Sequence, residues 1–195
     1  GIKEKLQGII ESLEKNISNN TKVVPVDDFY PAGYELNLVY ETTGRLIQPG
    51  ELPISQGCVV LNVETLYNMA ISKPVIDKYL TVAGAVENPR TIKVPIGTTY
   101  EDIIKEFKIE TRNFRVIADG LMMGGLVDDL SESITKKTSG ILVLPETHEY
   151  IKNREQYSNL DNTETMAKAA CDQCRYCTDL CPMYLLGHPV RPELA

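Results

Sequence analysis

Cysteine residues near the C-terminal end of the chain share a spacing that binds metal. The pattern C-x2-C-x2-C-x3-C-P is formed by Cys171, Cys174, Cys177, Cys181 and Pro182. Bacterial ferredoxins hold a [4Fe–4S] cluster with this spacing, because three thiolates on a tight loop wrap the cube and the fourth opens the next segment. A proline there keeps that segment from continuing the same turn. The run therefore predicts thiolate ligands for an iron–sulfur cluster.

Two other chemistries use clustered cysteines. Structural zinc sites usually separate two cysteine pairs by a dozen residues or more, and this run has no such gap. Disulfides suit secreted chains, and the sequence shows no signal peptide. The cluster is therefore favoured. Cys58, which stands alone in an apolar run, is expected to be a small buried hydrophobe.

Composition limits the classes of function. The chain has 195 residues, 43% of them hydrophobic, and a formal net charge of -7, which argues against a nucleic-acid surface. No apolar run approaches the length of a bilayer span. Clustered cysteines fit a reducing cytoplasm. The chain opens on Gly1 and stops soon after the cysteine run, so both ends look cut and a fragment of a longer protein is expected.

The part of the chain before Pro74 has the pattern of one half of an α/β sheet. Apolar residues at helical spacing predict a helix over 2–17, and a short apolar run predicts a strand over 23–26. A second run, 57–63, is interpreted as a buried strand, followed by a helix through Ile71.

Two junctions in this part could face a ligand. Residues 30–35 (Y-P-A-G-Y-E) form a tight turn before a helix, which would direct backbone N–H groups toward whatever lies above the sheet edge. Asn62 ends the predicted strand, where α/β folds place ligand contacts. The plain alternatives are a simple connection for the turn and a helix-capping side chain for Asn62.

At Pro74 the hydrophobic pattern changes, and a second module is expected to begin there. Thr99 caps a predicted helix over 100–107. Alternating residues predict strands over 79–86, 91–94, 115–118 and 141–144. A hairpin, one helix and two further strands make a compact α+β module in which the helix covers one face of the sheet.

Two loops of this module carry unusual residues. Met122 and Met123, flanked by glycines, lie in either a wide hairpin or a docking surface for a partner. Lys136 and Lys137 are either solvated side chains or contacts to an anionic cofactor.

The C-terminal part is expected to be helical. Residues 148–159 form a polar linker or a surface helix, and strong helix formers over 163–170 lead into the cysteine run. Apolar residues after Pro182 would pack on the cluster and tune its potential. His188 is expected to be a surface or capping residue, because four thiolates already complete the cube.

Three stretches resemble a known superfamily. Residues 30–35, 60–66 and 171–188 are similar, in this order, to the soluble RnfC component of Rnf-type ion-pumping complexes and more distantly to the flavin subunit of respiratory complex I. The strongest resemblance is to the propanediol-utilisation cobalamin reductases, to which the tail ending at His188 points. Weaker similarity covers nearly the whole chain.

The resemblance implies a fold of α/β plus α+β type in three domains. Residues 1–73 would be the C-terminal half of a Rossmann-like FMN and NADH domain. Residues 74–147 would be a β-grasp domain of the soluble-ligand-binding (SLBB) type. Residues 148–195 would begin a helical 4Fe–4S domain of the ferredoxin type.

The resemblance also implies cofactor contacts. Gly33 and Glu35 match the flavin and nucleotide loop, while Asn62 and Thr65 match the strand end beside the FMN phosphate. In a two-cluster domain, Cys181 would ligate the second cluster. No catalytic residue is assigned. The family's Gly-rich flavin loop and second cysteine run do not occur in this sequence, so the fragment alone is expected to be inactive.

The implied function is that of an NADH-dependent flavin and iron–sulfur oxidoreductase. FMN would take hydride from NADH, and electrons would pass singly to [4Fe–4S] clusters, two in the full-length protein, and on to a cobalamin or a redox partner protein. The expected location is the cytoplasm, a peripheral membrane complex or a bacterial microcompartment. The alternative is a non-enzymatic module that binds a ligand or partner and carries a structural or redox-sensing cluster.

Overall fold

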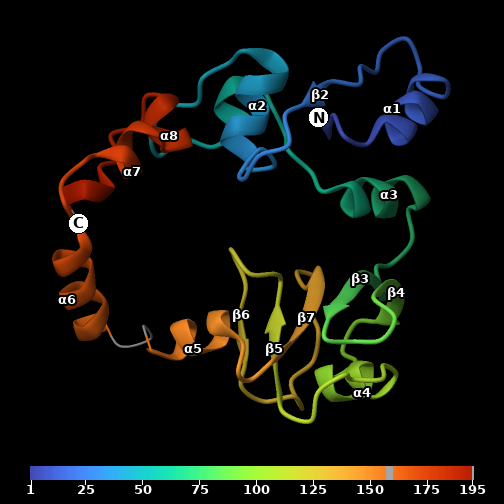
Figure 1. Ribbon diagram of the computed structural model, residues 1–195. Coiled ribbons are helices and arrows are strands. Elements are labelled where there is room, and N and C mark those ends of the chain that lie inside the picture. The colour runs from blue at the N-terminus through green and yellow to red at the C-terminus, as the bar shows by residue number, and fades with distance from the viewer. Residues whose placement is uncertain (157–159, 195) are drawn as a thin grey trace. The chain divides into compact units, whose positions relative to one another are not determined.

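The chain folds into two compact units (Figure 1), which are described separately. A computed structural model describes residues 1–156 and 160–194. One unit comprises Gly1–Asn62 and Cys171–Ala195, and the other comprises Val63–Ala170. In the sequence-based division, the boundaries fall after residues 73 and 147.

Short helices and two paired strands make up the first unit. Its elements are β1 (Ile2–Lys3), α1 (Gln7–Glu14), β2 (Pro25–Val26), α2 (Glu35–Thr43), η1 (Pro53–Gln56), α7 (Tyr176–Asp179), α8 (Pro182–Leu185) and η2 (Pro192–Leu194). The helix predicted over 2–17 is confirmed only as α1. The residues before it form β1, because the N–H groups of Ile2 and Glu4 donate to the carbonyls of Val24 and Val26 across the parallel pair with β2.

The predicted buried strand over 57–63 is wrong. Gly57 ends η1 in the left-handed region with φ at 69°, and residues 58–62 form no helix or strand. Val59 is 69% exposed, and Cys58 is half-buried where a buried thiol was expected. A strand needs a hydrogen-bonded neighbour. Within residues 1–156 and 160–194, no strand pairs with this segment.

A five-stranded mixed sheet forms the centre of the second unit. Its order is β4-β3-β7-β5-β6; β3 and β7 are parallel, and the other neighbours are antiparallel. The strands are β3 (Asp77–Gly84), β4 (Arg90–Pro95), β5 (Phe114–Ala118), β6 (Gly125–Val127) and β7 (Gly140–Pro145). The helices are α3 (Val63–Ile71), α4 (Tyr100–Lys105), α5 (Glu149–Gln156) and α6 (Leu160–Ala170).

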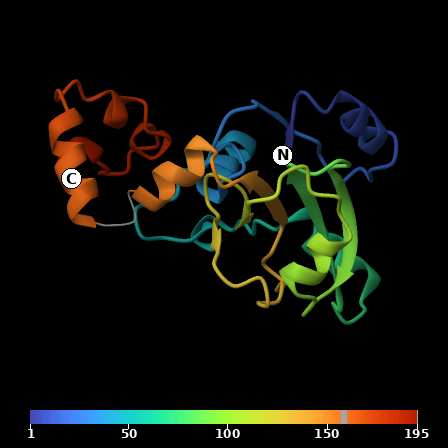
Figure 2. The same ribbon diagram turned by 60° about the horizontal axis from the view of Figure 1, so that its bottom comes forward.

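The core of this unit lies between the sheet and α4, which packs against one face of the sheet (Figure 2). Alternation along the strands directs every second side chain inward. The most buried of these are Leu80, Val82, Val116, Ile141 and Val143, which meet Tyr100, Ile103, Ile104 and Phe107. Thr99 caps α4 as predicted, because its hydroxyl accepts the N–H of Asp102 at 3.1 Å.

Gly84 allows β3 and β7 to approach each other. Its φ is 96°, and a Cβ there would lie 2.0 Å from the carbonyl oxygen of Val143. Only glycine fits a left-handed residue this close to another backbone. Gly97 has nearly the same φ, 95°, but a Cβ at that position would have nothing within 4 Å.

Helix α3 is fixed to the sheet by polar contacts. Glu64 forms an ion pair with Lys78 and accepts the N–H of Tyr79 at 2.9 Å; the two ion-paired side chains are 15% and 12% exposed. Burial acts to raise the pKa of Glu64. The hydrogen bonds from Lys78 and Tyr79 outweigh that effect and hold this pKa below its usual value.

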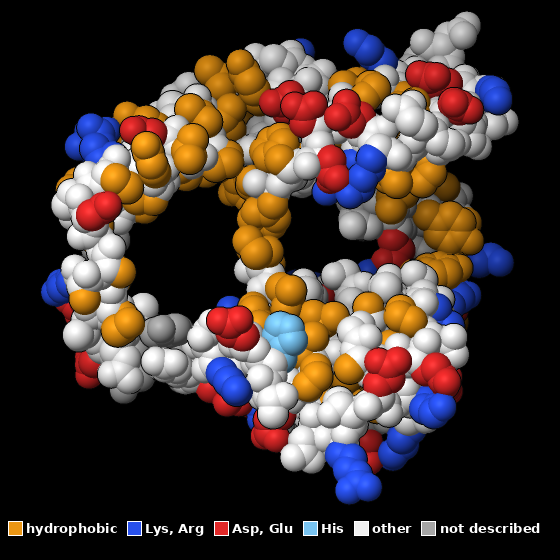
Figure 3. Space-filling view, viewed as in Figure 1, with side chains coloured by type: hydrophobic (Ala, Val, Ile, Leu, Met, Phe, Trp, Pro, Cys, Tyr) orange, Lys and Arg blue, Asp and Glu red, His pale blue; other side chains and the backbone are white. Residues whose placement is uncertain are grey.

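Helix α3 buries none of its own residues. Its apolar side chains and those that follow are exposed, and Figure 3 shows hydrophobic side chains gathered over this region. They are Val63, Leu66, Tyr67, Met69, Ile71, Val75 and Ile76.

Two local expectations were incomplete or wrong. The loop with Met122 and Met123 leads into β6, which the sequence pattern does not indicate because the strand has only three residues and begins with glycine. His188 is only 7% exposed, so a surface position for it is wrong. Among residues 1–156 and 160–194, no helix is both long and apolar enough to cross a bilayer.

Candidate iron–sulfur and flavin site

The cysteine run forms a coiled loop that begins directly after α6. Gln173 and Arg175 both have left-handed backbones, with φ at 60° and 65°. A non-glycine residue in this region costs about 1–3 kcal/mol and clusters at functional sites. Such residues turn successive N–H groups toward one side, as happens around anionic iron–sulfur clusters. The N–H of Cys174 donates to the Asp172 carboxylate at 3.2 Å, which tightens the same loop.

All of the predicted thiol ligands are free, so the disulfide alternative is not realised. Cys171, Cys174 and Cys177 are exposed, and Cys181 is half-buried. Among the residues that the structure describes, no group of three or more Cys, His, Asp or Glu side chains lies where it could hold a metal ion. The structure thus places the thiols on one loop but does not gather them. Their donor chemistry still fits an iron–sulfur cluster, since soft thiolates are the ligands that such clusters take and none of them is engaged in a disulfide.

A buried hydrogen bond holds the loop against the C-terminal segment. Thr178 is fully buried, and its hydroxyl donates to the carboxylate of Glu193 in η2. The guanidinium of Arg175 lies 3.9 Å from the same carboxylate and 3.7 Å from Asp179. The Thr178 hydrogen bond is the main cause that lowers the pKa of Glu193 below its usual value. No sequence pattern indicates this contact, because its partners come from different segments.

Residues 30–35, called the flavin-loop stretch from here on, form the turn before α2 and its first residue. The N–H of Ala32 donates to the carbonyl of Phe29 at 3.0 Å, and that of Tyr34 donates to the carbonyl of Pro31 at 2.7 Å. A Cβ on Gly33 would have nothing within 4 Å, so the backbone there is open to a ligand. Glu35 begins α2 in the first turn, where an acid is favourable.

An aromatic pocket lies between this stretch and the cysteine segment, within one compact unit. It has a volume of about 360 Å³. One side is formed by Phe29, Tyr30 and Tyr40, and the other by the segment from Leu180 to Leu186. Figure 3 shows hydrophobic side chains gathered over α7 and α8. An aromatic wall opposite aliphatic side chains suits a planar ring system.

Asn37 lines this pocket and carries a buried polar atom. The side chain is 5% exposed, and its Oδ1 is buried with no hydrogen-bond donor among the described residues. Buried acceptors are nearly always satisfied, so an unsatisfied one needs an explanation such as a missing ligand. An N–H donor on a planar ring would satisfy it. The sequence does not reveal this residue, because an Asn inside a helix is ordinarily solvated.

The remaining predicted flavin contacts lie elsewhere. Asn62 is exposed in irregular chain at the end of the first unit, and Thr65 is on α3 in the second. Thr65 lines a cavity of about 370 Å³ together with Lys73, Lys78 and Lys136. Three lysines against the single Glu64 suit an anionic group such as a phosphate.

Comparison with known proteins defines the class. The Nuo51 FMN-binding domain family matches residues 1–71, and the SLBB domain family matches residues 79–125. The chain is thus a mixed α/β protein with an SLBB domain and a segment that matches a flavin-binding family. These matches are those of the superfamily of RnfC and the complex I flavin subunit, as the sequence predicts, and within it the chain is similar to the cobalamin reductases.

Individual relatives agree with this assignment. The chain is 38% identical over 200 residues to the "Cobalamin reductase PduS" of Salmonella typhimurium, covering 99% of this chain and 44% of the relative. It is 31% identical over 193 residues to the RnfC-type subunit of the Na(+)-translocating ferredoxin:NAD(+) oxidoreductase complex of Acetobacterium woodii, covering 95% of this chain and 40% of the relative. The chain therefore spans less than half the length of these relatives.

Proposed function

We propose that this chain is part of an electron-transfer subunit that passes electrons from NADH through FMN to [4Fe–4S] clusters. The onward acceptor is a cobalamin or a redox partner protein. The relatives support the proposal by their names, one a cobalamin reductase and the other part of a ferredoxin:NAD(+) oxidoreductase complex. The proposed location is the cytoplasm, in a microcompartment or against a membrane complex.

One observation carries the proposal. The flavin-loop stretch and the cysteine run are far apart in sequence, yet they belong to the same compact unit and line one pocket. A protein that moves electrons from a flavin to a cluster needs these two stretches close together. Bound FMN supplies the conversion of a hydride's electron pair into single electrons that a cluster accepts.

The chain's own residues take positioning roles in this proposal. Tyr30 and Tyr40 bound the ring pocket, and Asn37 Oδ1 is an available acceptor for an N–H on the flavin ring. Gly33 leaves the backbone open to the ligand, and Glu35 places a carboxylate in the first turn of α2 beside it. Asn62 and Thr65 are the proposed contacts near the FMN phosphate.

In the cysteine run, Cys171, Cys174 and Cys177 are the proposed thiolates of one cluster, and Cys181 is the fourth ligand or a ligand of a second cluster. Leu185 and its neighbours line the pocket with apolar side chains next to the cysteine run, and the polarity around a cluster influences its reduction potential. The first unit is accordingly proposed to combine part of a Rossmann-like flavin domain with the start of a helical iron–sulfur domain.

Anaerobic reconstitution of the chain with iron and sulfide tests the thiolate assignment. A broad visible absorption and an EPR signal on reduction are expected. Cys171→Ala and Cys174→Ala should abolish bound iron, whereas Cys58→Ala, a matched change outside the run, should leave iron content unchanged. Equal iron in the Cys171→Ala and Cys58→Ala variants would refute the cluster. A full-length protein that bound no FMN and oxidised no NADH would favour the non-enzymatic module instead.

A further inference from the structure

A second cavity lies in the unit Val63–Ala170, under α5 and against the edge of the sheet. Its volume is about 860 Å³, within the range of small-molecule sites. It is lined by Arg115 of β5, Leu126 of β6, Asp128 just beyond β6, and the α5 residues Tyr150, Asn153, Arg154 and Glu155. None of these residues belongs to the proposed flavin contacts or the cysteine run.

Helix α5 is attached to the loop before β6 by two contacts, both from residues that line this cavity. The Tyr150 hydroxyl donates to the carbonyl of Leu121 at 2.7 Å, and the Arg154 guanidinium donates to the carbonyl of Gly124 at 2.9 Å. Arg154 forms no ion pair with any carboxylate of the described residues. Its positive charge is thus held in place beside the cavity without being neutralised by them.

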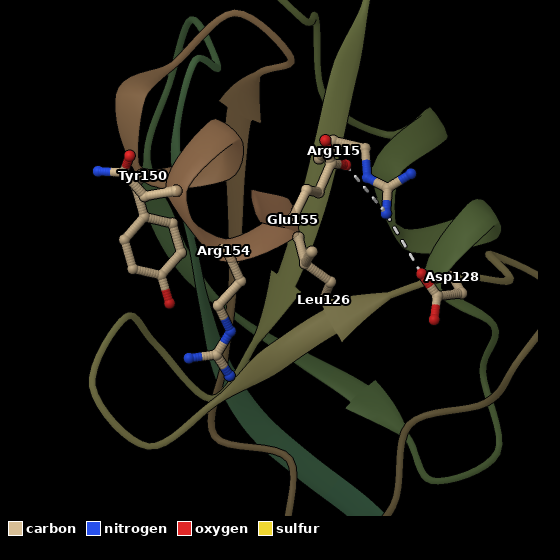
Figure 4. Close-up of a pocket in the computed structure, with 7 residues that line it drawn as sticks. Arg115, Leu126, Asp128, Tyr150, Arg154 and Glu155 are labelled. Carbon is tan, nitrogen blue, oxygen red and sulfur yellow. Dashed lines mark hydrogen bonds and ion pairs between the residues drawn. The ribbon is translucent and has the colours of Figure 1, made fainter. Parts of the chain in front are cut away.

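Arg115 is only partly used by the protein (Figure 4). Its Nη2 lies 3.2 Å from Oδ1 of Asp128 and 3.8 Å from Oε1 of Glu155. The adjacent Nε is buried and has no acceptor in the part of the chain that the structure describes. Nε and Nη2 are parallel donors on one edge of the guanidinium, which matches the two oxygens of a carboxylate or phosphate. Asp128 therefore occupies only half of a two-donor fork.

Asp128 is also easily displaced. Its side chain is 86% exposed, and exposed ion pairs of this kind contribute little to stability. Glu155 is half exposed, and its Oε1 lies 3.8 Å from Nη2 of Arg115, which is too far for a hydrogen bond between these two atoms. An oxyanion that displaced Asp128 could accept a hydrogen bond from Nη2 in its place. Its second oxygen could accept the N–H of Nε, which has no acceptor among the described residues.

We infer that this cavity binds a small organic oxyanion side-on at Arg115, with Arg154 as a second cation and the apolar body of the ligand against Leu126 and Tyr150. The shared chemistry is a carboxylate or phosphate group on an apolar or aromatic body. Binding at this site would be a function separate from electron transfer. The lining of the site includes α5, which lies outside the residues 79–125 that match the SLBB family.

Titration of the whole chain with phenyl phosphate, benzoate and neutral benzamide, followed by calorimetry or by amide NMR shifts, tests the inference. We expect both anions to bind at least tenfold more tightly than benzamide. Tighter binding of phenyl phosphate identifies a phosphate site, and tighter binding of benzoate identifies a carboxylate site. Equal affinity for all three compounds would overturn the inference.

Three variants check the geometry. Arg115→Lys keeps the charge but removes the fork, so affinity for the preferred anion should fall about tenfold; Arg112→Lys, the same change at an exposed position, should have no effect. Asp128→Asn removes the competing carboxylate at an exposed site that folding does not need, so affinity should rise severalfold. If Asp128→Asn weakened binding, or Arg115→Lys matched the Arg112→Lys control, the oxyanion would not sit at this fork.

Discussion

Replacing Asn37 by leucine should make the chain more stable and its flavin site weaker. Asn37 is 5% exposed and its Oδ1 has no donor among the described residues, and such an acceptor costs about 1–3 kcal/mol when buried. Leucine has a similar volume and no polar atom. The free energy of unfolding without FMN should therefore rise by about 1–3 kcal/mol, which urea unfolding of the chain measures.

The effect on FMN has the opposite sign. If Oδ1 accepts an N–H from the ring, the variant loses a hydrogen bond with a net worth of about 0.5–1.5 kcal/mol. FMN affinity of the full-length protein should then fall by about 2- to 13-fold. Asn20→Leu, at an exposed position of the same unit, is the control and should change stability by less than about 0.5 kcal/mol. Lower stability of the Asn37→Leu variant would mean that Oδ1 has a partner in the protein, and unchanged FMN affinity would remove Asn37 from the flavin site.

Three further predictions concern the glycine contact, the loop anchor and the last cysteine. Gly84→Ala should destabilise the chain by more than about 3 kcal/mol, because the new Cβ clashes with a backbone carbonyl and the residue is strained at this positive φ. The control Gly97→Ala adds only the strain, about 1–3 kcal/mol. Equal losses of unfolding free energy in urea would contradict the close approach of β3 and β7. Glu193 has a lowered pKa when folded, so its contribution to stability is present above its unfolded pKa and is lost as pH falls through the folded pKa. Thr178→Val should therefore lower the melting temperature at neutral pH, and the melting temperature of this variant should fall less on acidification than that of the unchanged chain. Parallel pH profiles of the two melting temperatures would show that the hydrogen bond does not contribute. Cys181→Ala should retain more reconstituted iron than alanine at any of the first three cysteines if Cys181 serves a second cluster, and equal loss would assign all four thiols to one cluster.

The second unit was largely predictable from the sequence because its signals are local. Alternation along β3 and β4 and the Thr99 cap of α4 are each set by neighbouring residues, and all are present. The apolar run over 57–63 gave a wrong strand, since a short apolar run does not reveal whether a partner strand exists. The edge strand β6 was not predicted, because its three residues show no strand pattern and only their pairing with β5 makes them a strand.

The sequence predicts which residues are candidate ligands, and that assignment stays a prediction; it does not reveal what surrounds them. Cysteine spacing is a local pattern that carries its chemistry with it. The unsatisfied amide of Asn37 and the buried contact between Thr178 and Glu193 depend on segments brought together by folding. The fork of Arg115 is of the same kind, because one partner follows β6 and the other belongs to α5.

The attachment of α3 gives Thr65 a second role. Residues 1–71 match a flavin-binding family, but Glu64 ties α3 to Lys78 and Tyr79 of the neighbouring sheet. Thr65 must then move with that sheet whenever the second unit turns. If Thr65 touches FMN in the full-length protein, flavin affinity reports on domain motion. A change in the orientation of the SLBB domain would then change FMN affinity without any direct contact between the rest of that domain and the cofactor.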